Sequence, residues 1–97
     1  MNKQVILTQF TGRMEEIRQR FSVSGLSIFG SVVRGEASEG SDVDVLVVFD
    51  RKATFDLFMD LKFYLEELLG TGVDLVTDKA LRPQIRRTIE KEMVDVA

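Results

Sequence analysis

Two aspartates at the start of an apolar run offer the clearest chemistry in this chain. Asp42 and Asp44 flank Val43, and the residues that follow are strongly β-forming. Alternate residues of a strand project from one face, so the two carboxylates point the same way and repel each other unless a cation lies between them. Carboxylate oxygens favour a hard ion such as Mg²⁺, whose remaining ligands are usually phosphates and water. The pair therefore predicts a Mg²⁺ site.

A third carboxylate, Asp74, lies inside a separate apolar run, 30 residues after Asp44. If the two runs are neighbouring strands, the three carboxylates converge on one metal site. The interval is long enough for a helical crossover between such strands. The chain has no histidine, the commonest general base. Asp74 is therefore the best candidate for drawing a proton from an attacking hydroxyl, either directly or as a metal ligand.

Gly30 and Ser31 follow a short apolar run, and ten residues separate Ser31 from Asp42. Because glycine has no side chain, a phosphate can approach its backbone closely. Ser31 adds a hydroxyl at a position where free N–H groups would open a helical turn, which favours an anion. Arg34 either contacts phosphate or orients this loop, and a solvated side chain is an equal alternative. Metal ions held by carboxylates can bridge a triphosphate, activate a hydroxyl and stabilise departing pyrophosphate.

The first half of the chain should place Gly30 and Ser31 at the end of a strand. Apolar residues recur at helical spacing over residues 5–21, which predicts one amphipathic helix. Gly25 breaks that pattern, and residues 26–29 are typical of a short buried strand. Residues 31–34 can form a helical turn that ends at Gly35.

The second half should place the aspartates on two strands joined by a helix. Residues 43–49 predict a central strand, residues 55–69 a helix capped by Thr54, and residues 73–77 a further strand. Pro83 suits the first turn of a last helix. Its expected inner face carries Ile85, Ile89 and Met93. The order predicts an α/β (α+β) fold with a small mixed sheet of about three strands flanked by helices, in a single domain over residues 1–97.

Composition excludes several classes of protein. Without cysteine there are no disulfides or thiolate metal sites, and a net charge of −3 argues against direct binding along a nucleic-acid backbone. The apolar runs are too short to cross a membrane, and the first residues do not resemble a signal peptide. A cytoplasmic protein is the expectation. Four cations near the last helix favour a solvated face over a phosphate-binding one: Arg82, Arg86, Arg87 and Lys91.

The Gly-Ser pair, the Asp42-x-Asp44 motif and the separate Asp74 together resemble the signature of the DNA polymerase β-type nucleotidyltransferase superfamily. The local sequence is most similar to the minimal nucleotidyltransferases (MNT, or MntA-like, proteins), and the resemblance covers nearly the whole chain. Val33 stands where the family often has alanine, a small apolar change that leaves the motif intact.

The resemblance implies a nucleotidyltransferase-like fold and an antitoxin that pairs with a HEPN-domain toxin. It implies transfer of AMP from ATP to a tyrosine of that toxin, with release of pyrophosphate. Gly30, Ser31 and Arg34 would bind the nucleotide, while the three aspartates would bind Mg²⁺ and carry the catalysis.

Three alternatives remain open from the sequence. A lone Asp-x-Asp is more often a solvated strand end, although the spacing to Gly30-Ser31 and the presence of Asp74 disfavour that reading. The protein could instead neutralise its partner by binding alone. It could also transfer a nucleotide to a small hydroxylated molecule, for which the sequence shows no acceptor pocket.

Overall fold

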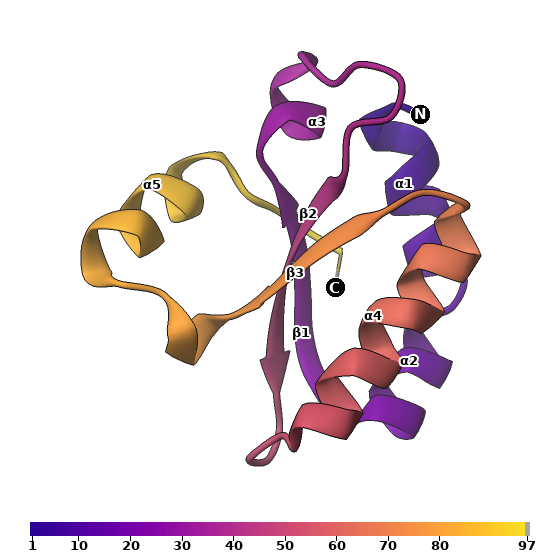
Figure 1. The fold of residues 1–97 in the computed structure, drawn as a ribbon, viewed down its shortest axis with the longest axis vertical. Helices are drawn as coiled ribbons and strands as arrows, with labels where there is room; N and C mark the ends of the chain where they lie inside the picture. Colours follow the sequence, from indigo (N-terminus) through magenta and orange to yellow (C-terminus); the bar gives the residue numbers. More distant parts are fainter. Residues whose placement is uncertain (97) are drawn as a thin grey trace.

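Four strands form one open, mixed sheet in the computed structural model, which describes residues 1–96 (Figure 1). Their order is β3-β2-β1-β4, with β1 antiparallel to both β2 and β4 and with β2 parallel to β3. The bounds are Val23–Phe29 for β1, Val43–Phe49 for β2, Val73–Thr77 for β3 and Val94–Asp95 for β4. The mixed α/β fold is confirmed, and β4 adds a short edge strand to the three expected.

Helix α4 (Phe55–Leu69) makes the crossover between the parallel strands β2 and β3. It begins and ends where its local signals predict. The Thr54 hydroxyl accepts a hydrogen bond from the backbone N–H of Leu57 at 3.1 Å. Gly70 ends the helix in the left-handed conformation, with a φ of 72°.

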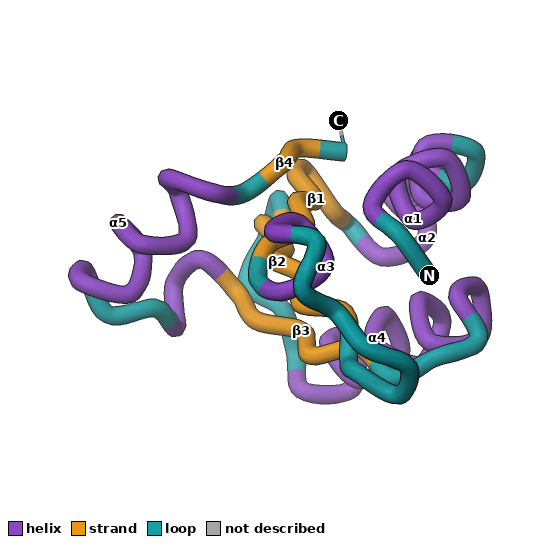
Figure 2. Tube along the Cα trace, turned by 90° about the horizontal axis from the view of Figure 1, so that it is seen from above, coloured by secondary structure: helices purple, strands orange, loops and turns teal. Residues whose placement is uncertain are grey.

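The helices lie on both faces of the sheet. Helices α1 (Lys3–Thr11), α2 (Met14–Phe21) and α4 cover one face, and α5 (Pro83–Glu92) lies on the other (Figures 1 and 2). The main core fills the space beneath α1, α2 and α4, where alternate residues of the central strand, Val43, Val45 and Val47, are buried. Asp44 alternates with these valines and so projects towards the face where α5 lies. In the described part of the chain, no helix is both long and apolar enough to span a bilayer.

The expected single helix over residues 5–21 is two helices, which is a correction to the sequence prediction. The chain bends at Gly12 and Arg13, where the N–H of Arg13 bonds to the carbonyl of Phe10 at 3.1 Å. Glycine is a poor helix former, so a bend there costs little. Strand β1 also begins earlier than expected, at Val23, because Gly25 is accommodated inside the strand at a shift in its pairing with β2.

The turn after β1 forms as predicted, whereas the last helix packs less fully than expected. Helix α3 (Ser31–Arg34) ends at Gly35, which has a φ of 74°. A short 3₁₀ turn (Asp78–Ala80) then leads from β3 towards α5. Ile89 is buried on the inner face of α5, but Ile85 is 50% exposed. The sequence prediction was therefore wrong for Ile85.

Replacing a buried leucine of α4 should cost far more stability than truncating an exposed aromatic residue of the same helix. Leu65 is fully buried, whereas Phe63 is 56% exposed. We expect Leu65→Ala to lower the free energy of unfolding by about 2–5 kcal/mol, since it removes buried methyl groups and leaves a cavity. Phe63→Ala should lose less than about 1 kcal/mol. Urea denaturation of both variants measures the difference, and equal losses would contradict the described packing.

Candidate active site

Strands β2 and β3 bring two of the predicted aspartates to paired positions. Asp44 and Asp74 are register partners in the parallel ladder. Their strand neighbours Val43, Val73 and Leu75 are buried, so both carboxylates project from the opposite face. Asp44 is half-buried and Asp74 is exposed. The convergence of Asp44 and Asp74, expected from the sequence, is therefore observed.

This pairing makes the Asp44 carboxylate costly to ionise. Burial raises the pKa of Asp44, and the charge of Asp74 and a hydrogen bond to its side chain raise it further. The charge of Asp42 adds a smaller contribution, and the Arg34 guanidinium opposes it. A group whose pKa is raised by neighbouring carboxylates is one that a bound cation would stabilise in its charged form.

Two glycines leave room for these carboxylates. A Cβ at Gly30 would overlap the Asp44 side chain, and a Cβ at Gly72 would overlap the Asp42 side chain. Gly30 also has φ 78° and ψ −153°, a conformation that is essentially restricted to glycine. The Asp44 carboxylate therefore lies directly against the backbone of Gly30, at the end of β1.

Asp42 lies just before β2, and its carboxylate lies beside Gly72. Among residues 1–96 no three acidic, histidine or cysteine side chains are already gathered as a metal-ligand set. The structure thus unites Asp44 with Asp74 and places Asp42 close enough to influence the pKa of Asp44. Oxygen donors, shared negative charge and glycines that leave space beside them fit a hard divalent cation. The role of all three aspartates as metal ligands remains a prediction.

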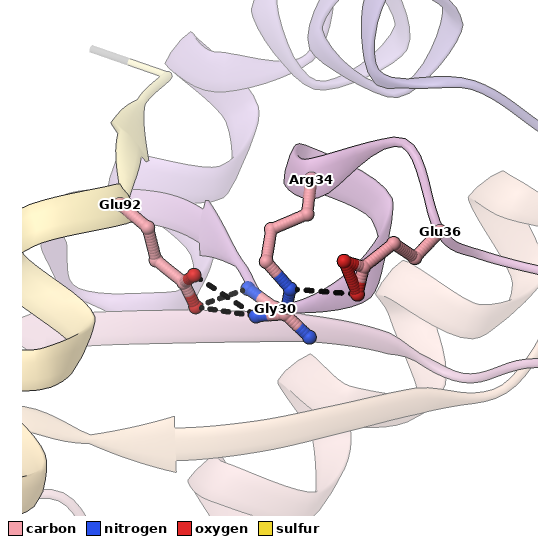
Figure 3. Close-up of polar contacts among 4 residues, drawn as sticks. All are labelled: Gly30, Arg34, Glu36 and Glu92. Atoms are coloured by element: carbon pink, nitrogen blue, oxygen red, sulfur yellow. Dashed lines mark hydrogen bonds and ion pairs between the residues drawn. The ribbon is translucent and has the colours of Figure 1, made fainter.

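The predicted nucleotide-binding residues lie at the end of β1 and in α3. Gly30 is buried, Ser31 is the first residue of α3, and Arg34 is its last. Arg34 is not simply solvated. Its guanidinium pairs with Glu36 at 3.0 Å and with Glu92 at 2.9 Å (Figure 3).

Glu92, at the end of α5, is a site residue that sequence reasoning missed. Its carboxylate accepts a hydrogen bond from the backbone N–H of Gly30 at 3.0 Å. The guanidinium of Arg34 and this N–H lower the pKa of Glu92. Glu92 is 62 residues from Gly30 in the chain, and it stands among charged residues typical of a solvated helix face. No local signal distinguishes it.

Comparison with known proteins identifies the family to which this arrangement belongs. The family model described as "Nucleotidyltransferase domain" matches residues 14–96. The chain belongs to the nucleotidyltransferase domain family. The protein adenylyltransferase MntA of Thermococcus cleftensis is 46% identical to this nucleotidyltransferase over 86 residues, which are 89% of this chain and 87% of that protein.

Solved structures agree on the fold. A candidate minimal nucleotidyltransferase superposes with a TM-score of 0.81 and 35% identity, covering 97% of this chain and 95% of the other. A second match is to the complex of the tri-AMPylated HEPN toxin of Shewanella oneidensis with an MNT antitoxin. There the TM-score is 0.68 with 14% identity, and the coverage is 94% of this chain and 71% of the other. The nucleotidyltransferase-like fold and the enzyme class expected from the sequence are confirmed.

Adding a methyl group at Gly30 should disturb both the backbone and Asp44 of the nucleotidyltransferase. We expect Gly30→Ala to lower the free energy of unfolding by about 1–3 kcal/mol through backbone strain, and to displace the Asp44 carboxylate. Gly40→Ala is the matched control, because Gly40 also has a positive φ, 87°, but no atom lies within 4 Å of its Cβ position. Thermal unfolding and nucleotidyl transfer should both be impaired more by Gly30→Ala than by Gly40→Ala.

Neutralising Asp44 should stabilise the metal-free nucleotidyltransferase at neutral pH. The pKa of Asp44 is raised in the folded state. The folded chain therefore holds its proton more tightly than the unfolded chain does, and stability falls as pH rises through the ordinary carboxyl range. In EDTA at pH 7, Asp44→Asn should therefore unfold at a higher denaturant concentration than wild type. The gain should vanish below about pH 3, where both states are protonated. Asp50→Asn, at the other end of β2, should show no such gain.

Proposed function

We propose that this nucleotidyltransferase transfers AMP from ATP to a tyrosine hydroxyl of a HEPN-type toxin and acts as the antitoxin of a toxin–antitoxin module. The observation that carries the proposal is the pairing of Asp44 with Asp74 directly beside Gly30. The 46% identity to a protein adenylyltransferase supports protein AMPylation. The fold shared with the MNT antitoxin of a toxin complex supports the partner class.

The donor half of the proposed site follows from the residues around β1 and β2. The Gly30 N–H, the Ser31 hydroxyl and Arg34 bind the triphosphate of ATP. Asp42, Asp44 and Asp74 hold Mg²⁺, which when bound neutralises the phosphates and lowers the pKa of a nearby hydroxyl. Carboxylates alone bind a triphosphate poorly because like charges repel, so these aspartates need a cation to work beside ATP.

The reaction is a displacement at the α-phosphorus of ATP. The tyrosine oxygen forms a bond to the α-phosphorus, and the bond from that phosphorus to the β-phosphate oxygen breaks. Pyrophosphate leaves, and AMP remains attached to the tyrosine through a phosphodiester. Asp74 draws the proton from the attacking hydroxyl, directly or as part of the ligand set. Its exposed position lets an approaching protein surface reach it.

The test is transfer of label from α-labelled ATP to a purified HEPN partner in the presence of Mg²⁺. We expect labelled partner from the wild type and at least a 100-fold lower rate from Asp42→Asn/Asp44→Asn, because removing both charges removes the predicted metal ligands. EDTA should abolish transfer by wild type. Asp50→Asn, just beyond the far end of β2, is the control for loss of an aspartate charge away from the site and should retain the wild-type rate.

Two results would contradict the proposal. One is the absence of label transfer from any nucleoside triphosphate, and the other is unchanged transfer by the double variant. If the double variant still neutralises the toxin fully in cells, the protein acts by binding, and the transfer activity is not what protects the cell. Label found on a small hydroxylated molecule rather than on the partner would support the small-molecule alternative.

A further inference from the structure

The carboxylate of Glu92 contacts two of the groups that are proposed to bind phosphate, the Gly30 N–H and the Arg34 guanidinium. Glu92 Oε1 accepts a hydrogen bond from the Gly30 N–H at 3.0 Å. Arg34 Nη1 lies 3.1 Å from Oε1 and 2.9 Å from Oε2 of the same carboxylate (Figure 3). Glu92 is the last residue of α5, whereas Gly30 and Arg34 lie at the two ends of α3, so these contacts join two elements that are far apart in the chain.

The contacts of Glu92 are those that a phosphate oxygen would make. A backbone N–H and an arginine guanidinium that converge on one anion form charge-assisted hydrogen bonds with either a carboxylate or a phosphate. The single N–H of Gly30 is directed at Glu92, and it cannot serve a phosphate in the same way at the same time. The two anions also repel each other. Glu92 and a triphosphate bound at Gly30 and Arg34 therefore exclude each other.

We infer that Glu92 is an internal competitor of the nucleotide, which contacts Gly30 and Arg34 when no triphosphate is bound and gives way when one binds. This inference rests on the proposed function, because it takes Gly30 and Arg34 as the triphosphate-binding groups. In this role Glu92 sets the affinity for the nucleotide and does not contact the reacting atoms.

The surroundings of Glu92 allow its carboxylate to leave without unfolding α5. The chain just after it is fixed by β4 and by the next residue, Val96, whose N–H bonds to the Leu26 carbonyl at 2.8 Å. The Ser27 hydroxyl bonds to the Asp95 carboxylate at 2.6 Å and fixes the same segment. The backbone can therefore stay in place while the partly exposed Glu92 side chain rotates into solvent. Arg34 would keep its contact with Glu36 during this exchange.

The decisive comparison is nucleotide binding by Glu92→Gln and by Glu90→Gln. Both substitutions remove one negative charge from α5, but Glu90 is exposed and has no contact with Gly30 or Arg34 in the described structure. Calorimetry with Mg²⁺ and α,β-methylene ATP measures binding without transfer, because the α-phosphorus cannot release its leaving group. Inorganic tripolyphosphate serves as a second probe that lacks the nucleoside.

We expect Glu92→Gln to bind both probes about fivefold more tightly than wild type, because apparent affinity is proportional to the fraction of molecules in which the binding groups are free. Glu90→Gln should stay within about twofold of wild type. In ¹⁵N-labelled wild type, the Gly30 amide signal should shift when tripolyphosphate is added. In unliganded Glu92→Gln it should already have moved from its wild-type position. Thermal unfolding confirms that both variants are folded.

The outcomes separate this inference from the proposed function. If wild type binds the probes and Glu92→Gln binds them equally or more weakly, Glu92 supports the site rather than competing for it, and the inference is overturned. The donor site itself survives that result. If neither wild type nor Glu92→Gln binds either probe, the proposed triphosphate site is wrong and the competitor role is wrong with it.

Discussion

The repulsion between Asp44 and Asp74 is the constraint on which the rest of the site depends. Two carboxylates that lie side by side would separate if their backbones were free to move. The parallel ladder of β2 and β3 prevents this by fixing them as register partners. That ladder in turn requires a crossover, and α4 supplies it by packing Leu61 and Leu65 into the core beneath the opposite face. The packing of the core on one face of the sheet thus holds the two carboxylates close together on the other face.

Glycine is the second requirement of this arrangement. Asp44 fits because Gly30 has neither a Cβ to overlap it nor a steric barrier to its positive φ. Any other residue would have to move the carboxylate or change the backbone at the end of β1. The same position also sets the direction of the Gly30 N–H, so the glycine couples the acidic groups to the anion-binding groups.

Local signals were enough to predict most of the elements that carry the site. Thr54 and Gly70 set the ends of α4, Gly35 ends α3, and the apolar run around Asp74 gives β3 its bounds. Asp44 and Asp74 could be paired in advance because a helical crossover between two strands has few other solutions. The residue types predicted metal-assisted chemistry on a triphosphate, and the family resemblance added AMP transfer to a tyrosine of a toxin partner.

The features that were not predicted from the sequence depend on contacts between distant segments of the chain. The bend at Gly12 could not be seen in the apolar pattern, because the helical spacing of apolar residues continues across it. Strand β4 is only two residues long and forms because β1 offers it an edge. In the sequence, Glu92 stands among charged residues and cannot be distinguished from any other exposed glutamate. Its position is fixed by β4, which follows it directly and pairs with β1.

The two sides of the site differ in charge, and this difference affects how the nucleotide donor binds. On one side, the Gly30 N–H and the Arg34 guanidinium already contact the Glu92 carboxylate, and Arg34 also pairs with Glu36. On the other side, burial and the neighbouring charge of Asp74 raise the pKa of Asp44, and the charge of Arg34 opposes this rise only in part. A triphosphate alone would add negative charge beside the aspartates, and a cation alone would leave Glu92 in place. A metal–triphosphate complex supplies a cation for the aspartates together with an anion that can replace Glu92, so the charge distribution of the site favours the complex over either component.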